Sequence, residues 1–429
     1  MAIKLTRFKT HNFKNIQTGE NGFCPGNLSI LIGPNGCGKS NLMAALRFFK
    51  EALVSGEDEN RSGTPLELAL NDLLGAPKIY DATLERPQTA QFILDFESED
   101  FPEGIRLDLS LKIQKQPPQI YIKEETLSSL RTNNIKNENF IYYKFHNQNT
   151  SKGVISIHKS TGQGTEFKTV EGCPTNNLAL REIPRLLENY GFSPEKTPLY
   201  KVRRLLIDFI SKWRFYNANY MMLEAIRFSE PKVGLTDMTI SSSGKNLPTV
   251  LDNMFQQDLD FEESITEACR SILPSTRKLR VTRPGRLNLS IEWHIKNFPN
   301  PFFLNEMSDG SIRMLCWAVI LKSPSLPPLI VIDEPELSLH VAWISVLAKW
   351  IKEAAARGSQ IIIITHSSDL LDHFSDQVEN VHCFKYEGNF HFSIAPLSKG
   401  ILSERLDEEG WQLGDLYRVG DPDVGGWPW

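Results

Sequence analysis

The stretch that decides the fold of this chain is Gly33-Pro34-Asn35-Gly36-Cys37-Gly38-Lys39-Ser40. It carries every fixed position of the phosphate-binding pattern GxxxxGK[ST]. The apolar run Ser29–Ile32 before it predicts a strand, and the spacing of apolar residues in Asn41–Phe49 after it predicts a helix. Such a loop points backbone N–H groups at phosphate oxygens, and the helix dipole adds to that field. We therefore expect Lys39 to neutralise the β- and γ-phosphates of a nucleotide and Ser40 to bind Mg²⁺.

A second motif lies far along the chain and completes the expected site. The apolar run Leu329–Ile332 predicts a buried strand of a parallel sheet, and Asp333 and Glu334 follow it. Asp333 is placed to hold Mg²⁺ through water, and Glu334 to polarise an attacking water. An acidic pair after a strand is weak evidence alone, but it is strong beside an intact phosphate loop. Because the two motifs must meet around one nucleotide, the residues between them are inserted into a nucleotide-binding domain.

Three further segments follow in an informative order. Met307–Arg313 precedes the acidic strand, and its Ser308 and Gly310 are expected to open a helix over Ile312–Leu321. The predicted strand Gln360–Thr365 ends at His366-Ser367, a place for a γ-phosphate sensor. Taken singly, Ser-Asp-Gly is more often an ordinary turn, and a His after a strand is more often structural. Their order and spacing behind one phosphate loop favour the functional interpretation.

This order of motifs resembles the ABC-type ATPase head that SMC, RecF-like and OLD-family proteins share. The segments that carry the resemblance are Leu5–Ile16, Gly33–Leu42, Ser308–Ser311, Asp333–His340 and Thr365–Ser367. It implies an α/β fold: a P-loop ABC-type ATPase head, with a mixed sheet flanked by helices, and a large α+β insertion between the Walker A loop and the signature motif.

The resemblance also implies a dimeric mechanism with ATP and Mg²⁺ as cofactors. In this family a phosphate loop and the signature segment of a second copy sandwich each ATP, so Ser308, Asp309 and Gly310 would act in trans. Glu334 would be the general base, with His366 and Lys39 as further catalytic groups, and Ser40 and Asp333 would hold the metal. The remaining nucleotide contacts would be Gly33, Pro34, Asn35, Gly36, Cys37, Gly38 and Asn41. For the Q-loop glutamine the sequence offers only Gln88 and Gln91 as candidates.

The sequence predicts four regions along the chain. They are an N-terminal part of the head over 1–56, an insertion over 57–300, a C-terminal part of the head over 301–400, and an aromatic tail over 401–429. Strand-like runs in the insertion are Phe92–Phe96, Ile105–Ile113, Gln119–Ile122 and Gly153–Ile157, and helical patterns follow over Leu178–Tyr190, Lys201–Arg214 and Ser264–Leu273. No heptad repeat is sustained, which excludes a long SMC-type coiled coil.

One basic stretch of the insertion is a possible nucleic-acid contact. Its basic side chains are Arg277, Lys278, Arg280, Arg283 and Arg286, and Pro284-Gly285 predicts a turn between strands. The alternative is a hairpin with a solvated basic face.

Composition restricts the remaining possibilities. The formal net charge is −5, so no global basic field argues for nucleic acid. The six cysteines are scattered singly, which suggests a reducing cytosol and no structural zinc. Cys37 is expected to be a small filler of the loop. No signal peptide or apolar run long enough for a membrane span is visible, so we expect a cytoplasmic protein without a membrane partner.

The C-terminal end shapes the functional hypotheses. The stretch after His366 is too short for the TOPRIM nuclease domain of OLD proteins, and the tail Trp427-Pro428-Trp429 is expected to be buried on its own head or on a partner. The tail resembles those of stand-alone ATPases of bacterial anti-phage systems. The leading hypothesis is therefore an ATPase subunit that regulates a separately encoded nuclease of TOPRIM or HNH type. The alternatives are a RecF-like DNA repair ATPase and, more weakly, a transporter motor.

Overall fold

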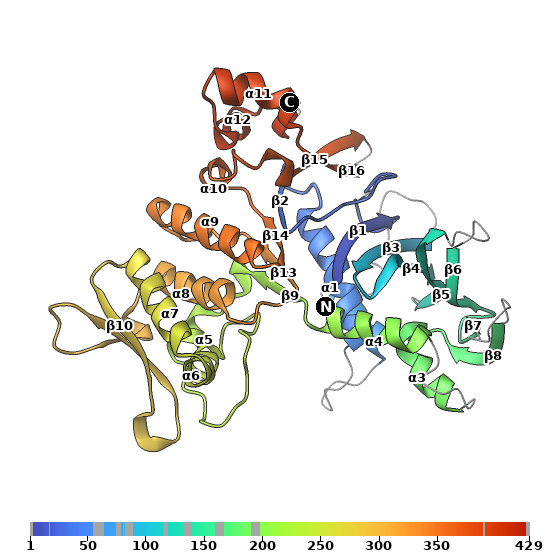
Figure 1. The fold of residues 1–429 in the computed structure, drawn as a ribbon, viewed down its shortest axis with the longest axis horizontal. Helices are drawn as coiled ribbons and strands as arrows, with labels where there is room; N and C mark the ends of the chain where they lie inside the picture. The colour runs from blue at the N-terminus through green and yellow to red at the C-terminus, as the bar shows by residue number, and fades with distance from the viewer. Residues whose placement is uncertain are drawn as a thin grey trace. The chain divides into compact units, whose positions relative to one another are not determined.

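The computed structural model divides into two compact units (Figure 1). The first unit comprises Met1–Gly26, Gly33–Trp213 and His382–Pro396, and the second comprises Asn27–Ile32, Arg214–Val381 and Leu397–Trp429. The residues that the structure describes are 3–16, 18–54, 64–73, 79, 81, 89–114, 119–132, 139–158, 167–189, 198–388 and 391–425.

The first unit is built on a seven-stranded antiparallel sheet. In spatial order its strands are β1 (Ile3–His11), β3 (Thr89–Ser98), β4 (Phe101–Gln114), β5 (Gln119–Thr132), β6 (Asn139–Asn147), β7 (Lys152–His158) and β8 (Phe167–Pro174). The helices of this unit are α1 (Lys39–Val54), α2 (Pro65–Asp72), α3 (Ala179–Asn189) and α4 (Pro198–Ser211). A hairpin of β15 (Val381–Gly388) and β16 (His391–Pro396) belongs to it from His382 onward.

Alternation along the strands gives this sheet one apolar and one polar face. In β3, Phe92 is fully buried and packs against Phe48 and Phe49 of α1, with ring centroids 5.7 and 5.4 Å away. The period of two then turns Asp95 to the opposite face. The helix that opens with the phosphate loop is thereby anchored on the inner face of the sheet.

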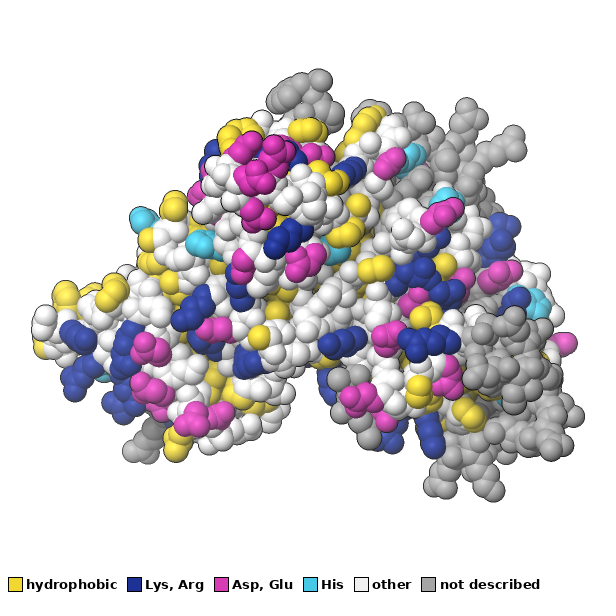
Figure 2. Space-filling view, turned by 45° about the horizontal axis from the view of Figure 1, so that its top comes forward, with side chains coloured by type: hydrophobic (Ala, Val, Ile, Leu, Met, Phe, Trp, Pro, Cys, Tyr) yellow, Lys and Arg dark blue, Asp and Glu magenta, His cyan; other side chains and the backbone are white. Residues whose placement is uncertain are grey.

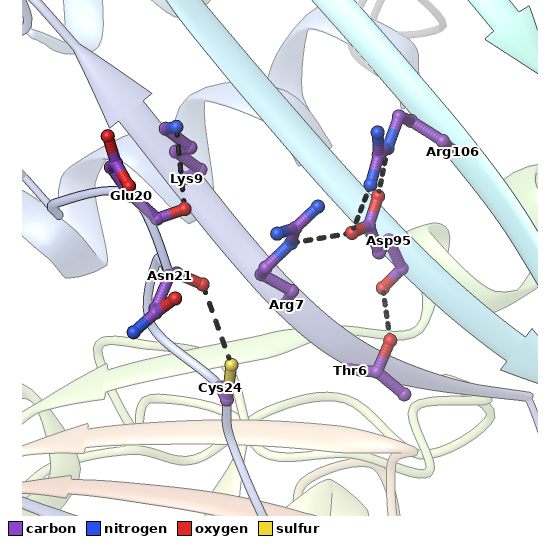
Figure 3. Close-up of polar contacts among 8 residues, drawn as sticks. All are labelled: Thr6, Arg7, Lys9, Glu20, Asn21, Cys24, Asp95 and Arg106. Carbon is purple, nitrogen blue, oxygen red and sulfur yellow. Dashed lines mark hydrogen bonds and ion pairs between the residues drawn. The ribbon is translucent and has the colours of Figure 1, made fainter. Parts of the chain in front are cut away.

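On the polar face an ion cluster ties three strands together (Figure 3). The Asp95 carboxylate is buried, and it accepts hydrogen bonds from Arg7 Nε of β1 at 2.6 Å and from Arg106 Nε of β4 at 2.7 Å. Two guanidinium groups on one carboxylate satisfy a charge that would otherwise be costly to bury. The cluster holds β1, β3 and β4 in one register.

The second unit contains a parallel sheet whose strand ends define an edge (Figure 1). Its strands are β2 (Leu28–Ile32), β14 (Gln360–Ile364), β13 (Leu329–Asp333) and β9 (Arg214–Asn217), in that order. Every residue of β2, β13 and β14 is buried, as expected for parallel strands covered on both faces. Asp333 pairs with both Ile364 and Asn217, so β13, β14 and β9 end together.

Helices and a small sheet complete the second unit. Ahead of the C-terminal segment, its helices are α5 (Leu223–Arg227), α6 (Leu247–Gln257), α7 (Leu259–Ile272), α8 (Asp309–Lys322), α9 (Val341–Ala356) and α10 (Ser368–Asp372). The small sheet has the order β10 (Thr276–Thr282), β11 (Ser290–Ile295) and β12 (Phe302–Phe303). A 3₁₀ turn over Pro284–Arg286 joins β10 to β11, so the predicted turn between strands is confirmed.

The predicted helix over Lys201–Arg214 is wrong at its C-terminal end. Helix α4 ends at Ser211, and Arg214 begins β9, which pairs with β13. A strand of four residues is too short to show the alternating pattern of a strand in its sequence. Its extended conformation is instead stabilised by pairing with β13. Residues from the predicted insertion thus complete the parallel sheet.

The C-terminal segment packs on its own second unit as far as Gly425. Its elements are α11 (Lys399–Ser403), a π-helical turn (Glu404–Glu408), α12 (Leu413–Val419) and a 3₁₀ turn (Pro422–Val424). Gly414 N donates to Asp372 Oδ1 of α10 at 2.7 Å, and Leu413 N donates to Ser375 Oγ at 2.9 Å. The predicted docking segment Trp427-Pro428-Trp429 lies outside the described residues, so its burial stays a prediction.

Candidate nucleotide-binding site

The phosphate loop sits where the sequence predicts it, between β2 and α1. Gly33 has a φ of 146° and Gly38 a φ of 103°, a conformation that residues with a side chain rarely adopt. A Cβ atom added at Gly33 would lie 2.9 Å from Phe384 Cβ, and one at Gly38 would lie 2.8 Å from Asn15 Oδ1. Both positions therefore require glycine for space as well as for backbone conformation.

Lys39 lies inside the loop. Its ammonium group donates to the carbonyl oxygens of Gly33 at 2.8 Å and Pro34 at 2.9 Å, and the residue is 4% exposed. A cation held by carbonyl oxygens is ready to exchange some of them for phosphate oxygens, which are stronger acceptors because they are charged. Burial raises the pKa of the neighbouring Cys37 thiol, which disfavours its thiolate form.

Side chains from the turn after β1 support the loop, and the sequence did not single them out. Asn15 Nδ2 donates to the Gly36 carbonyl at 2.8 Å, and Asn41 Nδ2 donates to Asn15 Oδ1 at 2.8 Å. Lys14 Nζ donates to Asn41 Oδ1 at 3.2 Å, and burial lowers the pKa of Lys14. Asn35, Gly36 and Ser40 are exposed. In the sequence, the segment Leu5–Ile16 is marked only by its resemblance to the family's first strand.

The acidic pair stands at the end of β13, held by two asparagines that the sequence analysis missed. Asp333 is 4% exposed, and its Oδ2 accepts a hydrogen bond from Asn217 Nδ2 at 2.8 Å. Glu334 has a φ of 52°, and its Oε2 accepts from Asn219 Nδ2 at 2.7 Å. The main-chain N–H of Glu334 donates to the Ile364 carbonyl at 2.8 Å. Both carboxylates are thus fixed by neutral donors at the edge where β9, β13 and β14 end.

Glu336 connects the acidic turn with the predicted switch. Its Oε1 accepts from Thr365 Oγ1 at 2.6 Å and from the main-chain N–H of His366 at 3.3 Å. Burial raises the pKa of the Glu336 carboxyl, and its Oε2 has no hydrogen-bond partner among the described residues. His366 is exposed directly after β14. The structure therefore brings His366 to the same strand edge as Asp333 and Glu334, through Ile364 and Glu336.

The predicted signature segment opens α8. Ser308 is the N-cap residue, and its Oγ accepts a hydrogen bond from Ser311 N at 3.2 Å. Asp309 pairs with Arg227, which also donates to the Met307 carbonyl at 2.6 Å. Ser308 and Asp309 are exposed, whereas Gly310 is buried. The predicted helix over Ile312–Leu321 is confirmed and begins earlier, at Asp309.

Gly310 is the point of closest packing at this helix start. A Cβ atom added there would lie 2.9 Å from Trp343 Cζ3 and 3.1 Å from the Ser338 carbonyl oxygen. The beginning of α8 is consequently held against the turn that follows the acidic pair.

Comparison with known proteins agrees with this geometry. The model of the family described as "AAA domain, putative AbiEii toxin, Type IV TA system" matches residues 28–161 and 175–372. The chain belongs to this family. The match includes the phosphate loop, the signature segment, the acidic pair and His366, so the chain is an SMC-like member of the AAA-type ATPases.

The chain is also similar to a chromosome partition protein and to solved Smc head structures. The "Chromosome partition protein Smc" of Rhodopseudomonas palustris is 28% identical over 127 residues, which are 28% of this chain and 10% of that protein. The chain thus spans about a tenth of the length of this relative. The crystal structure of an Smc head bound to the C-terminal winged-helix domain of ScpA matches with a TM-score of 0.51 at 15% identity, over 92% of this chain and 99% of that one. A Pyrococcus furiosus Smc head with an extended coiled coil gives a TM-score of 0.48 at 12% identity, over 95% and 99%.

The likeness to the Smc head confirms the fold class. It is an α/β P-loop ATPase head with helices and a large antiparallel sheet. At 15% identity this likeness shows the fold, and the roles of individual site residues rest on the sequence and geometry of this chain.

The residues present fit a nucleotide with a divalent metal, which the family implies. Gly33 and Gly38 line a cradle that a Cβ atom would fill, and the Lys39 ammonium lies within it. The predicted metal ligands, the Ser40 hydroxyl and the Asp333 carboxylate, are hard oxygen donors of the kind that Mg²⁺ takes. Asp333 is also oriented by a neutral amide, as metal-binding carboxylates usually are.

One of the two Q-loop candidates, Gln91, lies among the described residues. Gln91 lies on β3, and its Nε2 donates to both carboxylate oxygens of Asp108 on β4, at 2.9 and 3.1 Å. Gln88 lies outside the described residues.

The basic hairpin is less basic than its sequence indicates. Lys278 pairs with Glu262 at 2.7 Å and Arg283 with Asp252 at 3.3 Å. Around the small sheet of β10, β11 and β12, Figure 2 shows Asp and Glu side chains close to the Lys and Arg side chains. Arg277 and Arg280 are exposed and have no carboxylate partner among the described residues. The side chain of Arg286 is outside the described part.

One helix property bears on the expected partners. Among the described residues, no helix combines the length and apolarity that crossing a bilayer requires.

Proposed function

We propose that the chain binds ATP with Mg²⁺ and hydrolyses it, with the phosphate loop and the acidic pair serving one nucleotide. The observation that carries the proposal is the common edge of the parallel sheet. β2 and β13 run parallel on either side of β14, so Ile32 and Asp333 end at that edge, and Gly33 is bonded to Ile32. Glycine-rich loops and acidic residues at the carboxyl ends of such strands are the usual phosphate and metal ligands.

Each group has one role in this proposal. Lys39 and the loop N–H groups bind the phosphates, and Ser40 and Asp333 hold the metal. ATP and Mg²⁺, when bound, supply the phosphoryl group and neutralise its charge. Glu334 accepts a proton from the attacking water through the carboxylate that Asn219 orients. His366 stands at the end of β14 as the γ-phosphate sensor.

The test is steady-state ATP hydrolysis by the purified chain, with Mg²⁺ and with EDTA. We expect turnover that depends on Mg²⁺ and is lost in Glu334→Gln, while ATP still binds. Absence of hydrolysis in the wild type, under conditions in which ATP binds, would overturn the proposal.

Two copies of the chain close around ATP in this proposal. Ser308 and Gly310 of one copy contact the nucleotide on the phosphate loop of the other. Support comes from the exposure of Ser308 and Asp309 at a well-capped helix start, where N–H groups attract anions. ATP should therefore convert Glu334→Gln from monomer to dimer in light-scattering measurements. The added substitution Ser308→Arg should keep it monomeric without weakening its binding of ATP.

The dimer is proposed to regulate a separately encoded nuclease, of TOPRIM or HNH type, in a cytoplasmic anti-phage complex. Support comes from the family description, which names a putative AbiEii toxin of a type IV TA system. The test is co-purification from the native host with Glu334→Gln and ATP, together with phage plating after gene deletion. We expect a nuclease in the complex and increased phage sensitivity after deletion. If neither is observed, the defence role has no support.

A RecF-like role in DNA repair is the second candidate, and exposed Arg277 and Arg280 favour it. It requires ATP-dependent DNA binding by the chain alone, with an affinity that falls steeply as salt rises. Arg277→Glu with Arg280→Glu should then abolish binding, whereas the first candidate is indifferent to this change. Unaltered DNA binding by the double variant would exclude the hairpin as the contact.

A further inference from the structure

A three-residue bridge, Asn217-Ala218-Asn219, holds both acidic residues of the site. It begins at the last residue of β9 and continues into a 3₁₀ turn over Ala218–Tyr220. The two side-chain amides reach Asp333 and Glu334, and Asn217 Oδ1 accepts from the main-chain N–H of Asn219 at 2.7 Å. The two asparagines are therefore locked to each other as well as to the carboxylates, and they act as one unit.

The carbonyl between the two asparagines is bound by α8. Arg313 Nη1 donates a hydrogen bond to the Ala218 carbonyl oxygen. Arg313 is 7% exposed, and its Nε has no hydrogen-bond partner among the described residues. Burying a guanidinium with its Nε unpaired costs free energy, and the hydrogen bond to the bridge offsets part of that cost.

Arg313 and the signature residues belong to one rigid element. Arg313 follows Asp309 by one helical turn, and every residue of α8 from Gly310 to Leu321 is buried. One turn further along, Trp317 Nε1 donates to the Pro335 carbonyl at 3.0 Å, directly after the acidic pair. A helix packed on all sides moves as a body. A displacement at the start of α8 is therefore carried to the bridge and to the turn after Glu334.

We propose that Asn217 and Asn219 are positioning residues for Asp333 and Glu334, and that Arg313 couples this bridge to the signature end of α8. The inference rests on the proposed function, in which the start of α8 contacts the nucleotide held by a second copy. Engagement of α8 with that nucleotide then aligns the general base of the same chain for its own nucleotide. Hydrolysis at the two sites of the dimer is linked through Arg313.

The chemistry of the amides suits this role. A neutral Nδ2 donor fixes one oxygen of Glu334 without adding a charge, whereas a cation there would stabilise the carboxylate and weaken it as a base. Among the described residues, the other oxygen of Glu334 makes no hydrogen bond and is left for water. A carboxylate held in one rotamer keeps the geometry that proton transfer requires.

The experiment compares turnover and ATP affinity in matched variants of the full chain. Asn219→Ala and Arg313→Met remove the two links, and the double variant tests whether they act in series. Asn253→Ala is the control, because Asn253 Nδ2 donates to the Leu235 and Asp237 carbonyls of the same unit and does not contact the acidic pair. Arg313→Lys keeps a donor for the Ala218 carbonyl and guards against a loss of folding in Arg313→Met.

Removing a residue that orients a catalytic or metal-binding carboxylate lowers activity by about 10- to 100-fold. We expect that fall in kcat for Asn219→Ala and for Arg313→Met, with unchanged ATP affinity and unchanged ATP-dependent dimerisation in the Glu334→Gln background. The double variant should fall no further than the worse single variant, since coupled residues are not additive. Arg313→Lys should retain more turnover than Arg313→Met.

The outcomes separate this inference from the function on which it rests. If the wild type hydrolyses ATP and Glu334→Gln does not, normal kcat in Asn219→Ala would overturn the positioning role alone. If the effects of Asn219→Ala and Arg313→Met multiply, the coupling through Arg313 is wrong while the positioning role stands. If the wild type binds ATP without hydrolysing it, the proposed function fails and the inference falls with it.

Discussion

The phosphate loop and the acidic pair are built in opposite ways. The loop is one continuous stretch: Lys39 bonds to carbonyls five and six residues before it. The acidic pair depends on residues remote in sequence, since Asn217 and Asp333 are 116 residues apart and Asn219 and Glu334 are 115 apart. A site assembled from distant segments responds to movements of those segments. In the proposed function the loop serves ATP binding and the acidic pair controls hydrolysis.

The largest expected effect separates these two roles. Glu334→Gln removes the proposed base, so we expect the turnover of ATP to fall by about 10²- to 10⁴-fold. ATP affinity should be kept, because the phosphate loop is untouched. Turnover is measured by phosphate release and affinity by calorimetry. Wild-type turnover in this variant would show that Glu334 is not the general base and that the acidic pair does not control hydrolysis.

Lys39→Ala should weaken ATP binding, the property that Glu334→Gln leaves unchanged. It removes a charged donor to the phosphates, whose contribution of about 1.5 to 3 kcal/mol corresponds to roughly 10- to 100-fold weaker ATP binding. Calorimetric titration with ATP checks this, and the exposed Lys349→Ala serves as a control for loss of a lysine charge. Equal ATP affinity in Lys39→Ala and Lys349→Ala would remove the loop from the nucleotide site.

Glu336 provides a pH-dependent test of the acidic site, which is built from segments remote in sequence. Burial raises the pKa of its carboxyl in the folded state, so the native chain holds this proton at a pH where the unfolded chain has released it. Stability from this group is present below the unfolded pKa and is lost as pH rises through the folded pKa.

The free energy of unfolding of the wild type should accordingly fall relative to that of Glu336→Gln as pH rises from about 4 to 7. The difference is about 1.4 kcal/mol for each unit by which the pKa is raised. Urea titrations of both proteins across this range measure it. If the free energies of unfolding of both proteins change in parallel with pH, the pKa of the Glu336 carboxyl is not raised in the folded state.

The smallest effect concerns Asn15, which supports the loop from the turn after β1. Asn15→Ala leaves the Gly36 carbonyl without its side-chain donor, which should cost about 0.5 to 1.5 kcal/mol and weaken ATP binding by roughly 2- to 10-fold. Turnover at saturating ATP should not change. A fall in kcat with normal affinity would show that the loop, too, controls hydrolysis.

Much of the fold could be predicted from sequence because it is written in local patterns. The strands β2, β13 and β14 are apolar throughout, and the β3 region alternates with a period of two. The order of the motifs was sufficient for the family, which the comparison with known proteins confirms. Less could be predicted where an element is short: β9 has four residues, and its role arises from pairing with β13.

The sequence by itself determined the phosphate loop, because glycine conformation, lysine charge and the following helix act within one short segment. It also determined the acidic strand and the start of α8. Only the tertiary structure decided which groups hold the acidic pair: Asn217, Asn219 and Arg313 lie in unremarkable local sequence. The physical reason is that a hydrogen bond depends on distance in space, and the parallel sheet alone brings the ends of β9 and β13 together.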